Sequence, residues 1–262
     1  MNKSTVIFIH GMWDGPGVWG DYKKHFEANG FKTLAPALKH HDVKIGDPPP
    51  EGLGTTSLTD YADGIVDLVN SLDHPPIIVA HSLGGLVAQL VAARCKLACV
   101  VALCPAPPAG IFALRFSTLK IFGRISLTWA YWRKPTFPTY KEMRYGVFNR
   151  ISEADAQKGF QNCLWGSGLA LFEIGNWAFD KTKASRVDVD KISCPVLIFG
   201  AQYDHIVPAS LCRAAAKRYP AGACEYVELP DHAHWVLGED GWEKIADRCI
   251  DWIKSKVEKP TV

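Results

Sequence analysis

The 262-residue sequence lacks several patterns that would assign it to common protein classes. Its eight cysteines are scattered, with no CxxC pair and no Cys/His spacing typical of a metal site. Its formal net charge is only +2, which gives no overall basic field for binding nucleic acid. No stretch approaches the roughly 18 apolar residues of a membrane span, and MNKSTVIFIHG holds only four consecutive apolar residues before His10. We therefore expect a cytoplasmic protein with no nucleic-acid partner and no stable membrane insertion.

Short apolar runs alternate with helix-like segments along much of the chain. Six of them have the length and composition of β-strands: residues 5–9, 32–35, 77–80, 98–103, 196–199 and 225–229. The central runs are apolar throughout, as expected for strands covered on both faces. Residues 83–93 are apolar almost all round, which predicts a buried helix. This pattern predicts an α/β fold with a mostly parallel sheet of about six strands and helices on both faces.

The alternation stops between the fourth and fifth predicted strands. We expect residues 106–185 to form a helical cap, or lid, on a core made of residues 1–105 and 186–262. Residues 111–141 hold six Lys or Arg, eight aromatic residues and no acid. Such a composition suits a membrane-surface helix, but we favour a lid with an apolar face on the active site and a charged face in water.

The segment VAHSLGG joins a predicted strand to the buried helix. Ligands of open parallel sheets bind at the carboxyl ends of the strands, so Ser82 lies where a functional residue is expected. Ala80 and Gly84 supply the small side chains that a tight strand-to-helix turn needs. We interpret Ser82 as a nucleophile; the alternative is a serine that only caps the following helix.

A serine hydroxyl needs a base to remove its proton, and the base must be oriented by a third group. LPDHAHWVLGE, after the last strand, offers His232 and His234; we favour His234 and interpret His232 as a loop residue. His81 is adjacent to the serine, but the turn should direct neighbouring side chains apart. Four further histidines are expected at the solvated surface: His25, His40, His41 and His74.

The predicted acid follows the fifth strand. GAQYDHIVP supplies Asp204, whose alternative role is a turn or helix-capping aspartate. Asp231 is a second candidate, but it lies too close to His234 in the same loop to orient the ring comfortably. A tetrahedral oxyanion also needs fixed N–H donors. The predicted donors are the backbone N–H of Leu83, directly after the serine, and that of Met12 in HGMW.

Four motifs occur in the same order as in a known family. With FIHGMW, VAHSLGG, CPVLIFGAQYDHIVP and LPDHAHW, the sequence resembles the α/β-hydrolase superfamily. The resemblance implies that fold, a serine triad and no cofactor. HGMWDGPGVWGDY is also similar to the opening of plant methylesterases and hydroxynitrile lyases. Ala80 departs from the usual elbow glycine, and the chain starts on the family's third strand, so we expect a sheet smaller than eight strands.

The predicted function is a serine hydrolase of carboxylesterase type that forms an acyl-enzyme on Ser82. The aromatic lid, with Trp13 and Trp19, indicates a small hydrophobic ester, and Trp13 is the predicted substrate-binding residue. We expect no metal at residues 40–42 or 231–234, because the triad already accounts for a complete site. Lactonase, perhydrolase or hydroxynitrile lyase chemistry and a slow-turnover small-molecule receptor are the alternatives, and a homodimer is left open.

Overall fold

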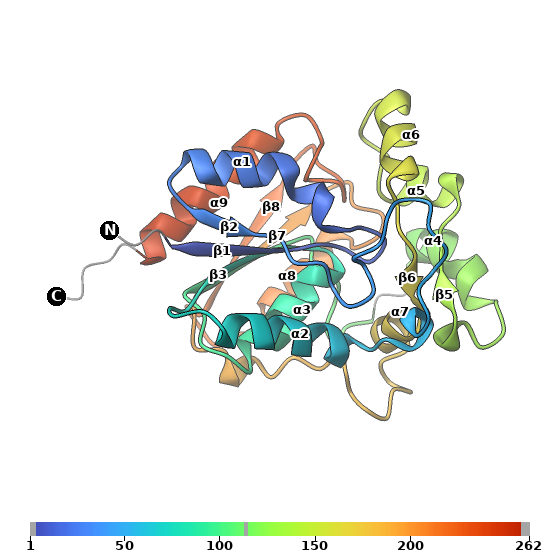
Figure 1. Ribbon diagram of the computed structural model, residues 1–262, viewed down its shortest axis with the longest axis horizontal. Helices are drawn as coiled ribbons and strands as arrows, with labels where there is room; N and C mark the ends of the chain where they lie inside the picture. The colour runs from blue at the N-terminus through green and yellow to red at the C-terminus, as the bar shows by residue number, and fades with distance from the viewer. Residues whose placement is uncertain (1–3, 113–114, 258–262) are drawn as a thin grey trace.

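A six-stranded sheet forms the centre of the computed structural model, which describes residues 4–112 and 115–257 (Figure 1). All its strands are parallel, in the order β2-β1-β3-β4-β7-β8. Their bounds are β1 (Thr5–Ile9), β2 (Lys32–Leu34), β3 (Ile77–His81), β4 (Cys99–Leu103), β7 (Val196–Ala201) and β8 (Cys224–Leu229). The predicted parallel sheet is confirmed, with strand ends shifted by one or two residues.

Side chains of each central strand alternate between two hydrophobic clusters, because successive residues of a strand point to opposite faces. In β1, Val6 and Phe8 pack into one cluster, and Ile7 and Ile9 into the other. Both faces are therefore buried, which explains why these strands are apolar throughout.

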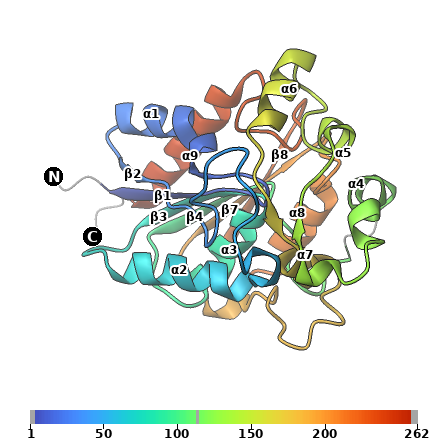
Figure 2. The same cartoon turned by 45° about the vertical axis from the view of Figure 1, so that its right-hand side comes forward.

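Helices cover both faces of the sheet (Figures 1 and 2). One cluster includes side chains of α2 (Leu58–Asn70), α3 (Leu83–Ala92) and α8 (Ala209–Ala216). The other includes side chains of α1 (Gly20–Ala28) and α9 (Trp242–Val257). All residues of α3 are buried, as predicted. A 3₁₀ turn at Pro16–Trp19 leads into α1.

The described part of residues 106–185, called the cap segment below, lies beyond the carboxyl ends of the strands (Figures 1 and 2). Their helices are α4 (Phe116–Ser126), α5 (Tyr140–Gly146), α6 (Glu153–Gln161) and α7 (Gly168–Gly175). A two-residue pair, β5 (Pro135–Thr136) with β6 (Gly166–Ser167), was not predicted. Within the two described ranges, no helix is both long and apolar enough to cross a membrane.

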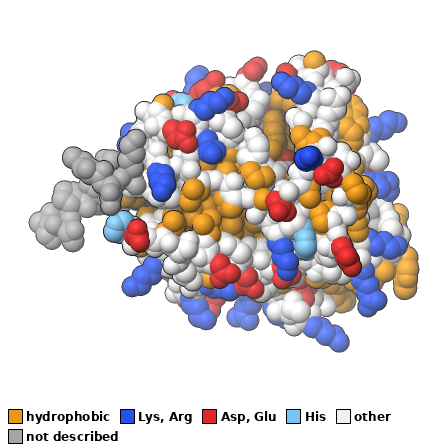
Figure 3. All heavy atoms as spheres, viewed as in Figure 1, with side chains coloured by type: hydrophobic (Ala, Val, Ile, Leu, Met, Phe, Trp, Pro, Cys, Tyr) orange, Lys and Arg blue, Asp and Glu red, His pale blue; other side chains and the backbone are white. Residues whose placement is uncertain are grey.

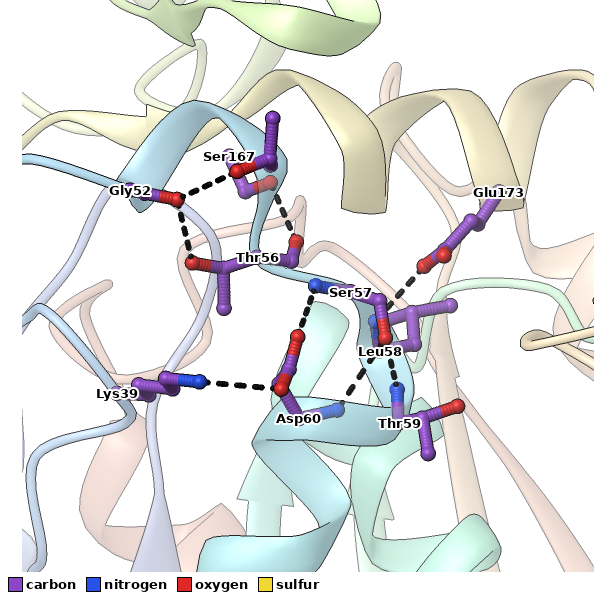
Figure 4. Close-up of polar contacts among 10 residues, drawn as sticks. Lys39, Gly52, Thr56, Ser57, Leu58, Thr59, Asp60, Ser167 and Glu173 are labelled. Carbon is purple, nitrogen blue, oxygen red and sulfur yellow. Dashed lines mark hydrogen bonds and ion pairs between the residues drawn. The ribbon is translucent and has the colours of Figure 1, made fainter.

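The cap segment is tied to the start of α2 by buried hydrogen bonds (Figure 4). Glu173 Oε2 on α7 accepts from the Leu58 N–H at 2.7 Å, and Ser167 Oγ donates to the Thr56 carbonyl at 2.6 Å. The Ser57 side chain caps α2, and the Asp60 carboxylate in turn accepts a hydrogen bond from the Ser57 N–H. Burial raises the pKa of Glu173 to about 7. An ionisable group therefore joins the cap segment to the core.

Candidate active site

Ser82 lies at the tip of the turn between β3 and α3. Its backbone has φ 54° and ψ −122°, a strained conformation for a residue with a side chain. Its side chain makes no capping hydrogen bond to α3, so the capping alternative has no support in the geometry. The turn is so tight that a Cβ on Gly84 would lie 2.4 Å from the His10 carbonyl oxygen and 2.5 Å from that of Ile9.

His234 joins Ser82 to Asp204. The Nε2 atom of His234 lies 3.0 Å from Ser82 Oγ, and its Nδ1 lies 2.7 Å from Asp204 Oδ2. One neutral tautomer satisfies both contacts, with Nδ1–H donating to the carboxylate and Nε2 accepting from the hydroxyl. The N–H groups of Ile206 and Val207 donate to Asp204 Oδ1 at 2.8 and 2.7 Å. The three predicted residues thus meet, from three separate loops.

The rejected candidates lie elsewhere. His81 Nε2 donates to the His234 carbonyl at 2.8 Å rather than contacting Ser82 Oγ. His232 Nδ1 lies 3.3 Å from Glu239 Oε2, which also accepts from the Ala233 N–H. Asp231 is exposed, with a backbone φ of 61°. These contacts favour His234 and Asp204 over their sequence neighbours.

Met12 and Leu83, the predicted oxyanion donors, line the same pocket as Ser82 and His234. Leu83 is the first residue of α3, so its N–H has no acceptor within the helix. The Met12 N–H shares a peptide with the Gly11 carbonyl, which accepts from His10 Nδ1 at 2.8 Å. Because His10 Nε2 accepts from the Leu38 N–H at 3.1 Å, the proton is fixed on Nδ1. Burial lowers the pKa of His10 to about 3, which keeps this tautomer neutral.

His41 is not at the solvated surface, as the sequence had suggested, but buried. Its Nε2 faces the Met12 carbonyl and its Nδ1 the Lys39 carbonyl, each at 3.1 Å. Burial lowers its pKa, so the neutral ring donates to one of the two carbonyls at a time. The reason for the error is that the loop around His41 folds over the Met12 turn, which no local pattern reveals.

A pocket of about 340 Å³ opens beside Ser82, between the sheet and the cap segment. Its lining is mostly apolar: Met12, Trp13, Phe122, Met143, Val147, Leu171, Ile206 and Val207 are among the lining residues. Trp13 stacks on Phe122 with ring centroids 5.8 Å apart. The expectation that Trp19 contributes to the pocket is wrong, because Trp19 is fully buried against Phe8 on the other face of the sheet.

The outer surface of the cap segment is only partly charged. Lys120 and Arg124 are exposed as expected, but Phe116 and Trp129 are also 83% and 84% exposed. In Figure 3, apolar side chains appear among charged ones at the right-hand edge, where Figure 1 places α4 and α5. The eight aromatic residues of this stretch thus divide between the pocket, the cap interior and the solvent.

Asp14 is a pocket residue to which the sequence assigned no role. It lines the cavity beside Ser82, and burial raises the pKa of its carboxyl to about 6. The only signal was its place in HGMWDG, just past the first strand. Among residues 4–112 and 115–257, no three His, Cys, Asp or Glu side chains are grouped so as to hold a metal ion.

Comparison with known proteins identifies the fold. A stretch of 98 residues is 34% identical to methylesterase 4 of Arabidopsis thaliana, and this match spans 34% of each chain. An Arabidopsis methylesterase structure superposes with a TM-score of 0.69, covering 95% of this chain and 99% of that one at 14% identity. A monoacylglycerol lipase from Paleococcus ferrophilus gives 0.67, covering 96% and 94% at 19% identity.

The chain thus spans about a third of the length of methylesterase 4, whereas the structural likeness covers nearly all of this chain. The family match is also broad, because residues 6–248 match the alpha/beta hydrolase family. Together with the six-stranded parallel sheet, these findings show that the chain belongs to the alpha/beta hydrolase family.

Proposed function

We propose that the protein is a serine esterase that hydrolyses a small, largely hydrophobic carboxylic ester. The observation that carries this proposal is the unbroken series of contacts from Ser82 Oγ to His234 to Asp204, at 3.0 and 2.7 Å. The methylesterase names of the matched relatives support the same class of reaction.

In the first half-reaction, Ser82 Oγ attacks the ester carbonyl while its proton passes to His234 Nε2. The carboxylate of Asp204 stabilises the resulting imidazolium. The N–H groups of Met12 and Leu83 bind the oxyanion of the tetrahedral intermediate. Collapse of this intermediate expels the alcohol, which takes the proton from His234, and leaves the acyl group on Ser82.

In the second half-reaction, water attacks the acyl-enzyme while His234 takes its proton. The second tetrahedral intermediate collapses, Ser82 recovers the proton, and the carboxylic acid leaves. No cofactor takes part in these steps. A hydroxynitrile lyase reading would need a cation in the pocket, and the described lining residues include no Lys or Arg.

A fluorophosphonate probe tests the nucleophile. We expect the wild-type chain to be labelled, Ser82→Ala to remain unlabelled, and p-nitrophenyl esters to be hydrolysed with a dependence on acyl chain length. Labelling that persists in Ser82→Ala would contradict the proposal. Labelling of Ser82 with negligible turnover would instead indicate a slow-turnover receptor.

A further inference from the structure

Three functional side chains converge at Gly11. A Cβ placed on Gly11 would lie 2.8 Å from Asp14 Oδ2, 3.4 Å from Ser82 Cβ and 3.5 Å from His81 Nδ1. Asp14, His81 and Ser82 all line the pocket. The Asp14 carboxyl is therefore close to the reacting hydroxyl, although it takes no part in the contacts of His234 with Ser82 and Asp204.

His81 presents a hydrogen-bond acceptor at this place. Its Nε2–H donates to the His234 carbonyl, and burial, reinforced by the neighbouring His234, lowers the pKa of the ring to about 3. The ring is thus neutral, and Nδ1 is an acceptor. The residue is 1% exposed, and within the described residues Nδ1 is buried with no hydrogen-bond partner. An unpaired buried acceptor costs free energy unless a ligand supplies a donor.

Among the described residues, no Lys or Arg contributes to the electrostatic environment of the Asp14 carboxylate. A hydrogen bond from the Gly11 backbone and the charge of His234 lower its pKa, but burial outweighs both. Burial raises the pKa of the Cys163 thiol, after α6, and the nearby Asp14 carboxylate adds to that shift. No Lys or Arg occurs among the described lining residues. The carboxylate thus gives this side of a mostly apolar pocket a negative charge.

We propose that Asp14 and His81 Nδ1 form a subsite for a hydrogen-bond donor, a hydroxyl or a protonated amine, carried by the ester close to its scissile carbonyl. The subsite rests on the proposed ester hydrolysis at Ser82. Two acceptors beside the nucleophile orient such a substrate and reject one with a carboxylate at the same position. The remainder of the pocket, which is mostly apolar, then holds the rest of the ester.

The test compares Asp14→Asn with the wild type on methyl esters of matched shape. The set consists of methyl 3-methylbutanoate and the 3-hydroxy and 3-amino analogues of methyl butanoate, with the corresponding 2-substituted series. The readout is the kcat/KM of each donor-bearing ester relative to its methyl isostere, which cancels effects common to all substrates. Asp240→Asn, which changes an exposed carboxyl, is the control.

We expect Asp14→Asn to lower this ratio by roughly 10-fold or more for the amino ester, and by less for the hydroxy ester, because asparagine keeps an acceptor oxygen. In the wild type, the ratio for the 3-amino ester should rise as the pH increases through about 6, where the carboxyl loses its proton. In Asp14→Asn it should be flat. Equal, pH-independent ratios in both proteins would overturn the subsite.

Binding to Ser82→Ala separates this proposal from the proposed function. The same esters are titrated calorimetrically into Ser82→Ala and into Ser82→Ala/Asp14→Asn, neither of which turns over. A preference for the donor-bearing esters that Asp14→Asn removes supports the subsite even where hydrolysis by the wild type fails. Equal affinities for all esters in both variants refute it even where hydrolysis is found.

Discussion

At the scale of single residues, Asp204 uses its two carboxylate oxygens differently. Oδ2 faces His234 Nδ1, and Oδ1 receives the N–H groups of Ile206 and Val207. The side chain is therefore held by the backbone while it fixes the imidazole tautomer. A substitution of Asp204 that preserves the shape of the side chain but removes its charge tests only its role in fixing the imidazole tautomer of His234.

We expect Asp204→Asn to fold normally and to lower kcat by about 10³–10⁴-fold. The amide nitrogen would face His234 and favour the tautomer with the proton on Nε2, which cannot accept the proton of Ser82. Steady-state kinetics on a p-nitrophenyl ester measure the effect. Asp231→Asn is the matched control, because Asp231 is exposed and its left-handed backbone suits asparagine. An Asp204→Asn variant with wild-type kcat would contradict the assignment.

The sequence was sufficient to nominate Ser82, Asp204 and His234, because each follows the end of a predicted strand, and for Ser82 and Asp204 that strand is a clear apolar run. It was insufficient for His10, His41 and Asp14. The positions of these side chains depend on how the loops after β1 and β2 fold against each other, as the contact of His41 with the Met12 carbonyl shows. Their roles follow from contacts between loops, which hydrophobic periodicity does not encode.

At the scale of elements, the junction of β3 and α3 leaves no space for a side chain at Gly84. The atoms that a Cβ would meet are the backbone of Ile9 and His10, at the end of the neighbouring strand β1. A rotamer change cannot relieve such a contact, so the elbow and the Met12 turn would both have to move.

We expect Gly84→Ala to lower the free energy of unfolding by about 1–3 kcal/mol, the usual cost of overpacking, and to lower kcat as well. Gly64→Ala is the control: Gly64 is exposed on α2 and nothing lies within 4 Å of an added Cβ. It should raise the free energy of unfolding by about 0.5–1 kcal/mol. Urea titrations of both variants measure these changes, and a Gly84→Ala variant at least as stable as Gly64→Ala would refute the argument.

Element prediction worked where the periodicity was strong and failed where tertiary contacts decided. The apolar runs of β3, β4 and β7 and the apolar helix α3 are explicit in the sequence. The pair β5–β6 is only two residues long in each strand and exists because the cap segment folds back on itself. No sequence window of that length carries a strand signal.

At the scale of the whole molecule, one hydrophobic cluster runs from the sheet into the cap segment. Ile7 and Ile78 of the sheet belong to the same cluster as Ile121, Met143 and Leu171 of the cap segment. We expect core and cap segment to unfold together, in a single calorimetric transition.

The stability of this assembly should depend on the ionisation of Glu173. The folded chain holds the carboxyl proton up to about pH 7, whereas the ordinary pKa is 4.5. The free energy of unfolding should therefore decrease as the pH rises from 4.5 through 7, by up to ~3 kcal/mol. Glu173→Gln, which keeps an acceptor for the Leu58 N–H, should lack this decrease.

Calorimetry of wild type and Glu173→Gln between pH 5 and about 8 measures the difference. The melting temperature of Glu173→Gln should increase relative to that of the wild type as the pH rises. Glu51→Gln changes an exposed carboxyl, and its melting temperature should show the same pH dependence as that of the wild type. A separate low-temperature transition of the cap segment, or parallel curves for Glu173→Gln and wild type, would contradict the expectation.

The positions of the free thiols determine how the protein would be oriented when it is attached to a support through sulfur. Six of the eight cysteines are buried, and the two that are partly exposed are Cys95 and Cys224. Cys95 follows the far end of α3, which starts at Leu83, and Cys224 opens β8 at the amino-terminal edge of the sheet. Both lie opposite the pocket, so a bead or fluorophore coupled through sulfur would leave the mouth of the cavity facing the solution.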